Sequence, residues 1–273
     1  MAKSNIRRIL LRIVLGSVLL LALPPAGLAL YWWLTFPDVK SLATVNPATT
    51  ALIEARLAEA RAQNPDAEPN RVWAPLAEIA LELQHAVIIS EDASFYFHEG
   101  FDWEGIKEAA LHDLAEGKLQ RGGSTITQQL AKNLYLSSGK TLLRKANEAL
   151  IADALERHLT KKRILELYLN VVEWGRGVYG VEAAARHHFG KHAADLSPEE
   201  AALLAAMLPS PRTYDPLKVT HYLSVRQQQI LRLMNERQGK QSLTGNEDGT
   251  RIIPRQPKEN GTPSGPRPVR ETK

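Results

Sequence analysis

The chain has 273 residues, 44% of them apolar, and a formal net charge of +4 that results from 34 basic and 30 acidic side chains. This imbalance is far weaker than the basic patches of a dedicated nucleic-acid binder, so we expect no nucleic acid among the partners. The sequence contains no cysteine, which excludes disulfides and thiol chemistry.

The first segment has the composition of a membrane anchor. No charged residue occurs from Ile13 to Leu34, and a helix needs roughly 20 apolar residues to cross a bilayer. The preceding residues include basic side chains and no acidic one, which predicts that this end stays in the cytoplasm while the rest is exported. We therefore predict a basic cytoplasmic segment (1–12) and one transmembrane helix (13–36). The alternative is a cleaved signal peptide, but the apolar run continues past the small residues of a cleavage site into aromatic residues.

Apolar spacing divides the exported part into three predicted regions. Residues 37–80 have a helical pattern that breaks at Asn64 and Pro65, which predicts a membrane-proximal helical approach. Residues 81–237 repeat apolar side chains every three or four positions without sustained alternation, which predicts a mainly α domain. Residues 238–273 are rich in Gly, Pro and charged residues and lack periodicity, so we predict a disordered tail.

Two adjacent carboxylates, Glu91 and Asp92, end an apolar stretch and are followed by aromatic residues. Partial burial at the edge of a cleft would raise the pKa of such a carboxylate and make it a usable base. The alternative is a helix end with solvated acids beside aromatic side chains of the core. By itself the segment favours this second interpretation, so its chemistry depends on the motifs that follow.

A pair of glycines precedes a predicted helix start that is rich in polar groups. Thr125 and Gln128 have the spacing of a capping box, and the free amide groups of a helix start attract anions. Gln128, Gln129 and Lys132 are expected on the face opposite the apolar stripe. Amide and hydroxyl side chains suit sugar hydroxyls and phosphates better than they suit a merely solvated helix face.

Two cations and a carboxylate share one predicted helix face in the next motif. Arg144, Lys145 and Glu148 fall within an arc of about 100°. The apolar residues expected to be buried on the other side are Leu143, Ala146 and Leu150. An ordinary salt-bridged exterior is the alternative interpretation of this helix.

A second capping box is predicted further along the chain. Ser197 and Glu200 have the required spacing, and Pro198 stands at the first helical position. An alanine-rich helix should therefore begin there and run to Met207, where prolines follow it. We expect this helix to be scaffold.

In their order along the chain, these motifs resemble the transglycosylase domain of the penicillin-binding proteins and its monofunctional relatives, the family 51 glycosyltransferases. The matching segments are Glu91 to Gly100, Gly123 to Asn133, Arg144 to Glu148, Lys161 to Asn170 and Ala201 to Pro211. After Pro211 neither a Ser-x-x-Lys nor a Lys-Thr-Gly motif occurs, so no transpeptidase follows. The chain is therefore most similar to the monofunctional biosynthetic form.

The resemblance implies a mainly α, lysozyme-like domain with a smaller membrane-proximal jaw lobe, and peptidoglycan glycosyltransferase activity. It implies that Glu91 deprotonates the 4-hydroxyl of lipid II, which then attacks the growing strand with inversion and releases undecaprenyl diphosphate. Glu148 would orient nearby cations or help to hold a divalent cation, Mg or Mn, and no organic cofactor is expected. The residues implied to bind substrate are Ser124, Gln129, Lys132, Asn133, Lys140, Arg144 and Lys145. The resemblance implies an arginine at position 140, where this chain has Lys140. A point charge therefore replaces a bidentate phosphate contact.

The resemblance and the predicted anchor together place the enzyme in a bacterial inner membrane, with its catalytic domain in the periplasm. Its expected partners are lipid II, the growing glycan strand, the membrane, and proteins of cell-wall synthesis or division. One rival is a membrane-bound lysozyme-like hydrolase or lytic transglycosylase, in which Glu91 would be a general acid. Such an enzyme needs no diphosphate site, so the cations at Arg144 and Lys145 argue against it. The other rival is a non-catalytic cell-wall scaffold.

Overall fold

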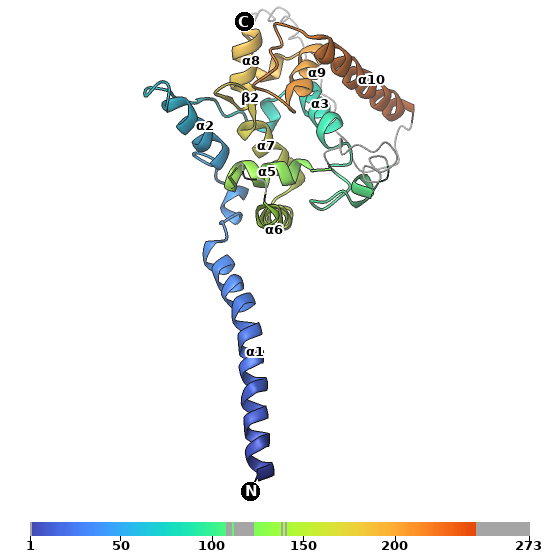
Figure 1. Cartoon of the computed structure of the whole chain (residues 1–273). Helices are drawn as coiled ribbons and strands as arrows, with labels where there is room; N and C mark the ends of the chain where they lie inside the picture. The colour runs from blue at the N-terminus through green and yellow to red at the C-terminus, as the bar shows by residue number, and fades with distance from the viewer. Residues whose placement is uncertain (1, 108–110, 112–122, 138, 140, 244–273) are drawn as a thin grey trace, which may run out of the picture. The chain divides into compact units, whose positions relative to one another are not determined.

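The computed structural model describes residues 2–107, 111, 123–137, 139 and 141–243, and most of these lie in helices, which confirms the predicted mainly α class (Figure 1). The helices are α1 (Ala2–Thr35), α2 (Ala51–Arg61), α3 (Leu81–Glu91), α5 (Ile126–Tyr135), α6 (Leu142–His158), α7 (Lys161–Val171), α8 (Val181–Phe189), α9 (Pro198–Met207) and α10 (His221–Leu243). Short 3-10 turns are η1 (Lys40–Ala43), η2 (Leu76–Glu78) and η3 (Ala193–Asp195).

The chain divides into two compact units, Met1–Asn235 and Glu236–Lys273. The first unit contains every element that matters for the candidate site. α10 continues to Leu243, beyond the predicted domain end at 237, and the predicted tail lies outside the described residues from position 244 onward. Among the described residues, no helix is both long enough and apolar enough to span a membrane.

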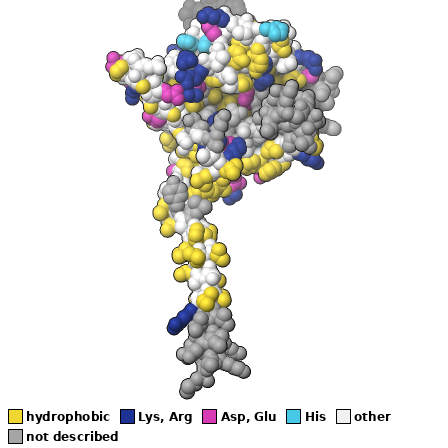
Figure 2. All heavy atoms as spheres, viewed as in Figure 1, with side chains coloured by type: hydrophobic (Ala, Val, Ile, Leu, Met, Phe, Trp, Pro, Cys, Tyr) yellow, Lys and Arg dark blue, Asp and Glu magenta, His cyan; other side chains and the backbone are white. Residues whose placement is uncertain are grey.

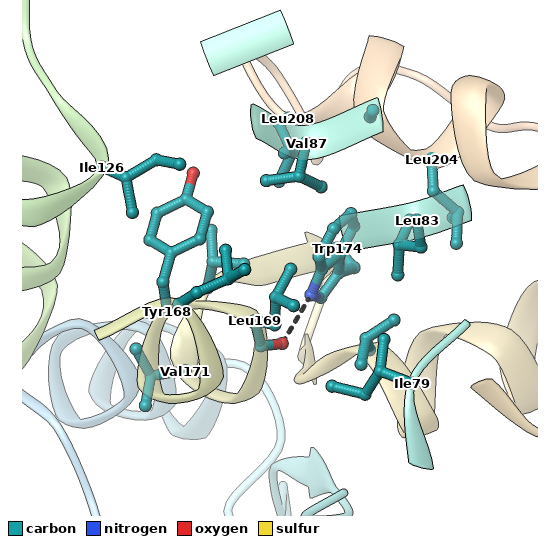
Figure 3. Packing of buried hydrophobic residues seen from close by; sticks show 14 of the residues in the cluster. Ile79, Leu83, Val87, Ile126, Tyr168, Leu169, Val171, Trp174, Leu204 and Leu208 are labelled. Atoms are coloured by element: carbon teal, nitrogen blue, oxygen red, sulfur yellow. Dashed lines mark hydrogen bonds between the residues drawn. The ribbon is translucent and has the colours of Figure 1, made fainter. Parts of the chain in front are cut away.

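The core of the first unit forms around Trp174, which is fully buried (Figure 3). Its indole N–H donates a hydrogen bond of 3.3 Å to the carbonyl of Leu169, near the end of α7. Leu83 of α3 and Leu204 of α9 lie beside its ring, and these two helices pack closely against each other. This packing fixes the position of α3, at whose last residue Glu91 lies.

Three very short strands form a small sheet next to this core. They are β1 (Asn70–Arg71), β2 (Glu173–Gly175) and β3 (Val178–Tyr179), in the order β1-β3-β2. β3 is parallel to β1 and antiparallel to β2. Strands of this length contain too few residues to show the alternation by which a sequence predicts a strand.

The start of α9 confirms the predicted capping box. The Ser197 hydroxyl accepts a hydrogen bond of 3.3 Å from the amide of Glu200, and the Glu200 carboxylate accepts one of 2.9 Å from the amide of Ser197. Pro198 is the first helical residue, and the helix ends at Met207. All the contacts that define this start are local, so the sequence was sufficient to find it.

The predicted orientation of α6 was wrong in its first half. Leu143 and Leu150, which were expected to be buried, are 54% and 37% exposed, and Leu142 is 91% exposed. Glu148, which was expected on the outer face, is buried. The polar side of this half of the helix faces α5, which itself presents polar residues, so the apolar side is left outward. In Figure 2 hydrophobic side chains gather on the lower face of the domain, where Figure 1 places α6.

Candidate active site

Glu91 stands at the point where α3 ends. The preceding residues Ala86, Val87 and Ile88 are buried and hold the helix in the core. The side chain of Glu91 is 11% exposed, so its carboxylate lies at the edge of the protein interior and still reaches solvent. Burial raises the pKa of Glu91 above its usual value, as a general base requires.

Asp92 ties the end of α3 to the start of α5. Its carboxylate accepts a hydrogen bond of 2.9 Å from the amide of Ile126, the first residue of α5. His98 Nε2 lies 2.9 Å from the same carboxylate and donates to it, because a carboxylate only accepts. Asp92 is buried, and these two contacts fix where Glu91 stands relative to α5.

A chain of hydrogen bonds orients the Glu91 carboxylate. Gln129 of α5 donates from Nε2 to Glu91 Oε2 over 3.0 Å, and the phenol of Tyr168 donates to the Gln129 amide oxygen, also over 3.0 Å. Burial raises the pKa of Tyr168 well above its usual value, so the phenol keeps its proton and acts as the donor. The Tyr168 bond therefore sets which end of the Gln129 amide faces Glu91.

Arg226 of α10 reaches the same carboxylate from the other side. Its Nη2 lies 3.9 Å from Glu91 Oε1 and donates a hydrogen bond of 3.3 Å to the carbonyl of Ser90. The positive charge opposes the effect of burial on the pKa of Glu91, and so do the Gln129 hydrogen bond and the charge of Lys132, whereas the charge of Asp92 adds to it.

The start of α5 has the predicted capping box, with one difference from the expected exposure. Thr125 accepts from the amide of Gln128 over 3.2 Å, and the Gln128 side chain accepts from the amide of Thr125 over the same distance. Gln128 is therefore buried against its own helix start, and the expectation that it lies on the open polar face was wrong. Thr125 also donates to the carbonyl of Gly100 over 2.7 Å, which joins α5 to the segment after Glu91.

A cationic cluster lies where α6 meets the start of α5. Arg144 Nη1 donates to Glu148 Oε2 over 2.6 Å, and Lys145 Nζ pairs with Glu148 Oε1. Lys145 also donates to the Ser124 hydroxyl over 3.2 Å. The Glu148 side chain is 4% exposed, and its charge is compensated by these two cations, whose own side chains are 18% exposed at Arg144 and 48% exposed at Lys145.

Lys132 of α5 interacts electrostatically with this cluster and with Glu91. Removal of water by neighbouring protein atoms lowers its pKa, as do the charges of Arg144 and Lys145, while the carboxylates Glu148 and Glu91 raise it. The charge of this one ammonium group therefore interacts with both parts of the site. Of the other predicted residues, Asn133 is buried one turn after Gln129, and Lys140 lies outside the described residues.

Among the described residues, the donors around Glu148 do not fit a divalent cation held by the protein. Both oxygens of Glu148 are already taken by Arg144 and Lys145. In the described part of the chain, no group of three or more His, Cys, Asp or Glu side chains is arranged to bind a metal.

A separate hollow of about 680 Å³ contains none of these residues. It is lined in part by Arg56 of α2, Glu173 of β2 and Arg212. Arg56 Nε lies 3.3 Å from Glu173 Oε2, and Arg212 Nε lies 3.9 Å from Glu173 Oε1. Glu59 pairs with the same two arginines, over 3.1 Å and 3.0 Å, so two carboxylates compensate two guanidinium groups. We interpret the cluster as an ion-pair network that joins α2 to the sheet.

Sequence reasoning missed Arg226 and Tyr168. Arg226 is 136 positions away from the carbonyl it binds, so no local spacing connects the two. One signal was present: Leu223, Ile230 and Met234 form the buried stripe of α10, and Arg226 lies beside it. An arginine at the edge of a buried stripe needs a partner across the interface.

A family model described as "Transglycosylase" matches residues 57–235 of this chain. A protein from Dechloromonas aromatica is 50% identical over 204 residues, which cover 74% of this chain and 88% of the relative. One from Herminiimonas arsenicoxydans is 43% identical over 231 residues, which cover 84% of this chain and 96% of the relative. One from Chromobacterium violaceum is 53% identical over 170 residues, which cover 62% and 75%. Each of these relatives carries the name "Biosynthetic peptidoglycan transglycosylase".

Proposed function

The chain belongs to the transglycosylase family, and we propose that it polymerises lipid II into peptidoglycan strands with Glu91 as the catalytic base. One observation carries this assignment. Gln129 of α5 binds the carboxylate of Glu91, and Ser124, just before α5, binds Lys145 of the cationic cluster, so one helix start joins the base to the cations. Lys132 of the same helix interacts electrostatically with both.

Glu91 acts on the acceptor sugar. Its carboxylate removes the proton of the 4-hydroxyl of lipid II, and that oxygen attacks the anomeric carbon of the growing strand. A β-1,4 C–O bond forms as the C–O bond to the diphosphate breaks, and the electron pair leaves with undecaprenyl diphosphate. Gln129 holds the carboxylate oxygen that does not take the proton, and Tyr168 holds Gln129.

The cationic cluster acts on the leaving group. Lys132, Arg144 and Lys145 stabilise the negative charge that develops on the diphosphate, because positioned cations are most effective in a partly dehydrated site. Lys140 is proposed as a further contact. Glu148 keeps the arginine and the lysine of α6 in one orientation through its two oxygens. Mg or Mn, if needed, would be carried by the diphosphate itself.

We propose that residues 13–36 anchor the enzyme in the inner membrane with the catalytic domain in the periplasm. Leu15, Leu19 and Leu23 of α1 are 61%, 61% and 59% exposed, and apolar side chains without protein cover are stable in lipid. The exposed Leu142 and Leu143 directly precede the cations of α6. Contact of these leucines with lipid would bring the cationic cluster to the depth of the substrate's diphosphate.

The test is the reaction of the purified full-length protein with lipid II in detergent. We expect a polymer that a muramidase degrades, and release of one undecaprenyl diphosphate for each bond formed. Preformed glycan strands offered as the only substrate should stay intact. Release of soluble sugar from those strands, without polymer from lipid II, would show a hydrolase or lytic enzyme and contradict the proposal.

A further inference from the structure

The segment after α1 enters the core of the catalytic domain almost at once. α1 ends at Thr35, and Val39 and Leu42 are only 3% and 5% exposed in the main hydrophobic core. The three residues between Thr35 and Val39, 36–38, can span at most about 10 Å when fully extended. The connection therefore lacks the length of a flexible tether.

Arg163, near the start of α7, binds the continuation of this segment through three of its donors. Nε donates to the carbonyl of Leu42 over 2.7 Å, and Nη2 donates to the carbonyl of Val45 over 3.1 Å and to the side chain of Asn46 over 2.8 Å. Nη1 pairs with Glu166 on the next turn of α7, which fixes the plane of the guanidinium.

Arg71 of β1 binds the next two residues in the same manner. Nη2 donates to the carbonyl of Pro47 and Nη1 to the carbonyl of Ala48, each over 2.9 Å. The ring of Trp73 lies 5.6 Å from the guanidinium carbon of Arg71 and 5.6 Å from that of Arg163. The two arginines thus share one aromatic support, and together they hold residues 42–48, which we call the mount.

The mount is attached to helices that carry the candidate site. α7 contains both Arg163 and Tyr168, whose phenol fixes Gln129. η1, which overlaps the start of the mount, packs against α6, the helix of the cationic cluster. Just before the mount, Pro37 lines the same hollow as Tyr135, at the end of α5. Burial raises the pKa of Tyr135 to about 12, and the charge of Asp38 adds to this effect.

We propose that Arg71 and Arg163 are positioning residues, which hold the mount so that the active site stays at one height and orientation over the membrane. This inference rests on the proposed function and on the proposed anchor. Its consequence is specific to a substrate whose diphosphate is held at a fixed depth by a lipid chain in the same bilayer. A soluble substrate can reach the site at any height, whereas an embedded one cannot.

The experiment compares two substrates with full-length enzyme. One is lipid II with its full polyprenyl chain in vesicles that also contain the enzyme, and the other is a short-chain analogue in detergent solution. The variants are Arg163→Ala combined with Arg71→Ala, and an insertion of Gly-Ser-Gly-Ser between Phe36 and Pro37 that leaves both arginines in place. We expect each variant to lose about tenfold or more of the rate in vesicles, and less than about twofold in detergent.

The matched control is Arg61→Ala. Arg61 also binds a backbone carbonyl, that of Ala67, over 3.1 Å and a carboxylate, that of Glu68, over 2.7 Å, but it lies outside the mount. Its two rates should remain at the wild-type level. Equal losses with both substrates, or no loss in vesicles for either mount variant, would overturn the inference. A wild-type enzyme without polymer in both settings would instead contradict the proposed function.

Discussion

Replacement of Asp92 by alanine is expected to destabilise the protein and to displace its base. The buried carboxylate accepts one hydrogen bond of 2.9 Å from the amide of Ile126 and one of 2.9 Å from His98. A hydrogen bond to a charged group contributes about 1.5–3 kcal/mol net, and a buried donor without a partner adds a desolvation cost. The segment that follows α3 can relax and admit water at this position. We therefore expect Asp92→Ala to lower the free energy of unfolding by the lower part of that sum, about 3–4 kcal/mol.

The Asp92→Asn variant separates the two contacts. The asparagine oxygen can still accept from the amide of Ile126. Its amino group could donate to His98 Nε2 only if the imidazole proton moved to Nδ1, which is buried without a hydrogen-bond partner, so the contact with His98 is lost. Asp92→Asn loses one contact instead of two, so we expect its free energy of unfolding to fall by about 1.5–2 kcal/mol. Asp215→Ala is the matched control, because the Asp215 carboxylate also accepts from a backbone amide, over 2.9 Å, but is exposed. Its effect should stay below about 1 kcal/mol.

Urea unfolding of the full-length variants in detergent measures these free energies, and polymerisation of lipid II measures the displacement of Glu91. Both quantities should fall in the order wild type, Asp92→Asn, Asp92→Ala. An Asp92→Ala protein with the wild-type unfolding midpoint would refute the idea that this carboxylate joins α3 to α5.

Two further predictions concern the charges around the site. Arg226→Gln removes the positive charge 3.9 Å from Glu91, which raises the pKa of Glu91. Because only the deprotonated carboxylate is a base, the acidic limb of the pH profile of kcat/KM should move to higher pH. Gln227→Ala, which removes another contact of α10, should leave that limb in place. Arg144→Met removes one proposed charge-assisted contact to the charge that develops on the diphosphate, so kcat/KM should fall about tenfold or more. Arg157→Met breaks a similar but more exposed ion pair on the same helix and should not change kcat/KM.

The parts of the molecule that the sequence predicted are those determined by neighbours in the chain. The capping boxes at Thr125 and Ser197 depend on residues three positions apart, and both are present. The ion pair between Arg144 and Glu148 depends on one helical turn and is also present. Such contacts form wherever the helix forms, so spacing alone identifies them.

What the sequence could not predict depends on which surface of another element a side chain meets. The first half of α6 carries leucines on one side and charges on the other, and a helix of this kind normally buries its leucines. Here the neighbouring start of α5 is itself polar, so Glu148 is buried and Leu143 is exposed. Tyr168 and Arg226 reach the Glu91 region from α7 and α10, and no local pattern assigns them to it.

The most direct test of the central claim is the rate at which Glu91→Gln polymerises lipid II. The amide has the shape of the carboxylate and can still accept from Gln129, so the variant should unfold at the wild-type midpoint and bind lipid II with unchanged affinity. Because it cannot take up the proton of the acceptor hydroxyl, its rate should fall by about 100-fold or more. A folded variant that polymerises at close to the wild-type rate would contradict the role of Glu91 as the base.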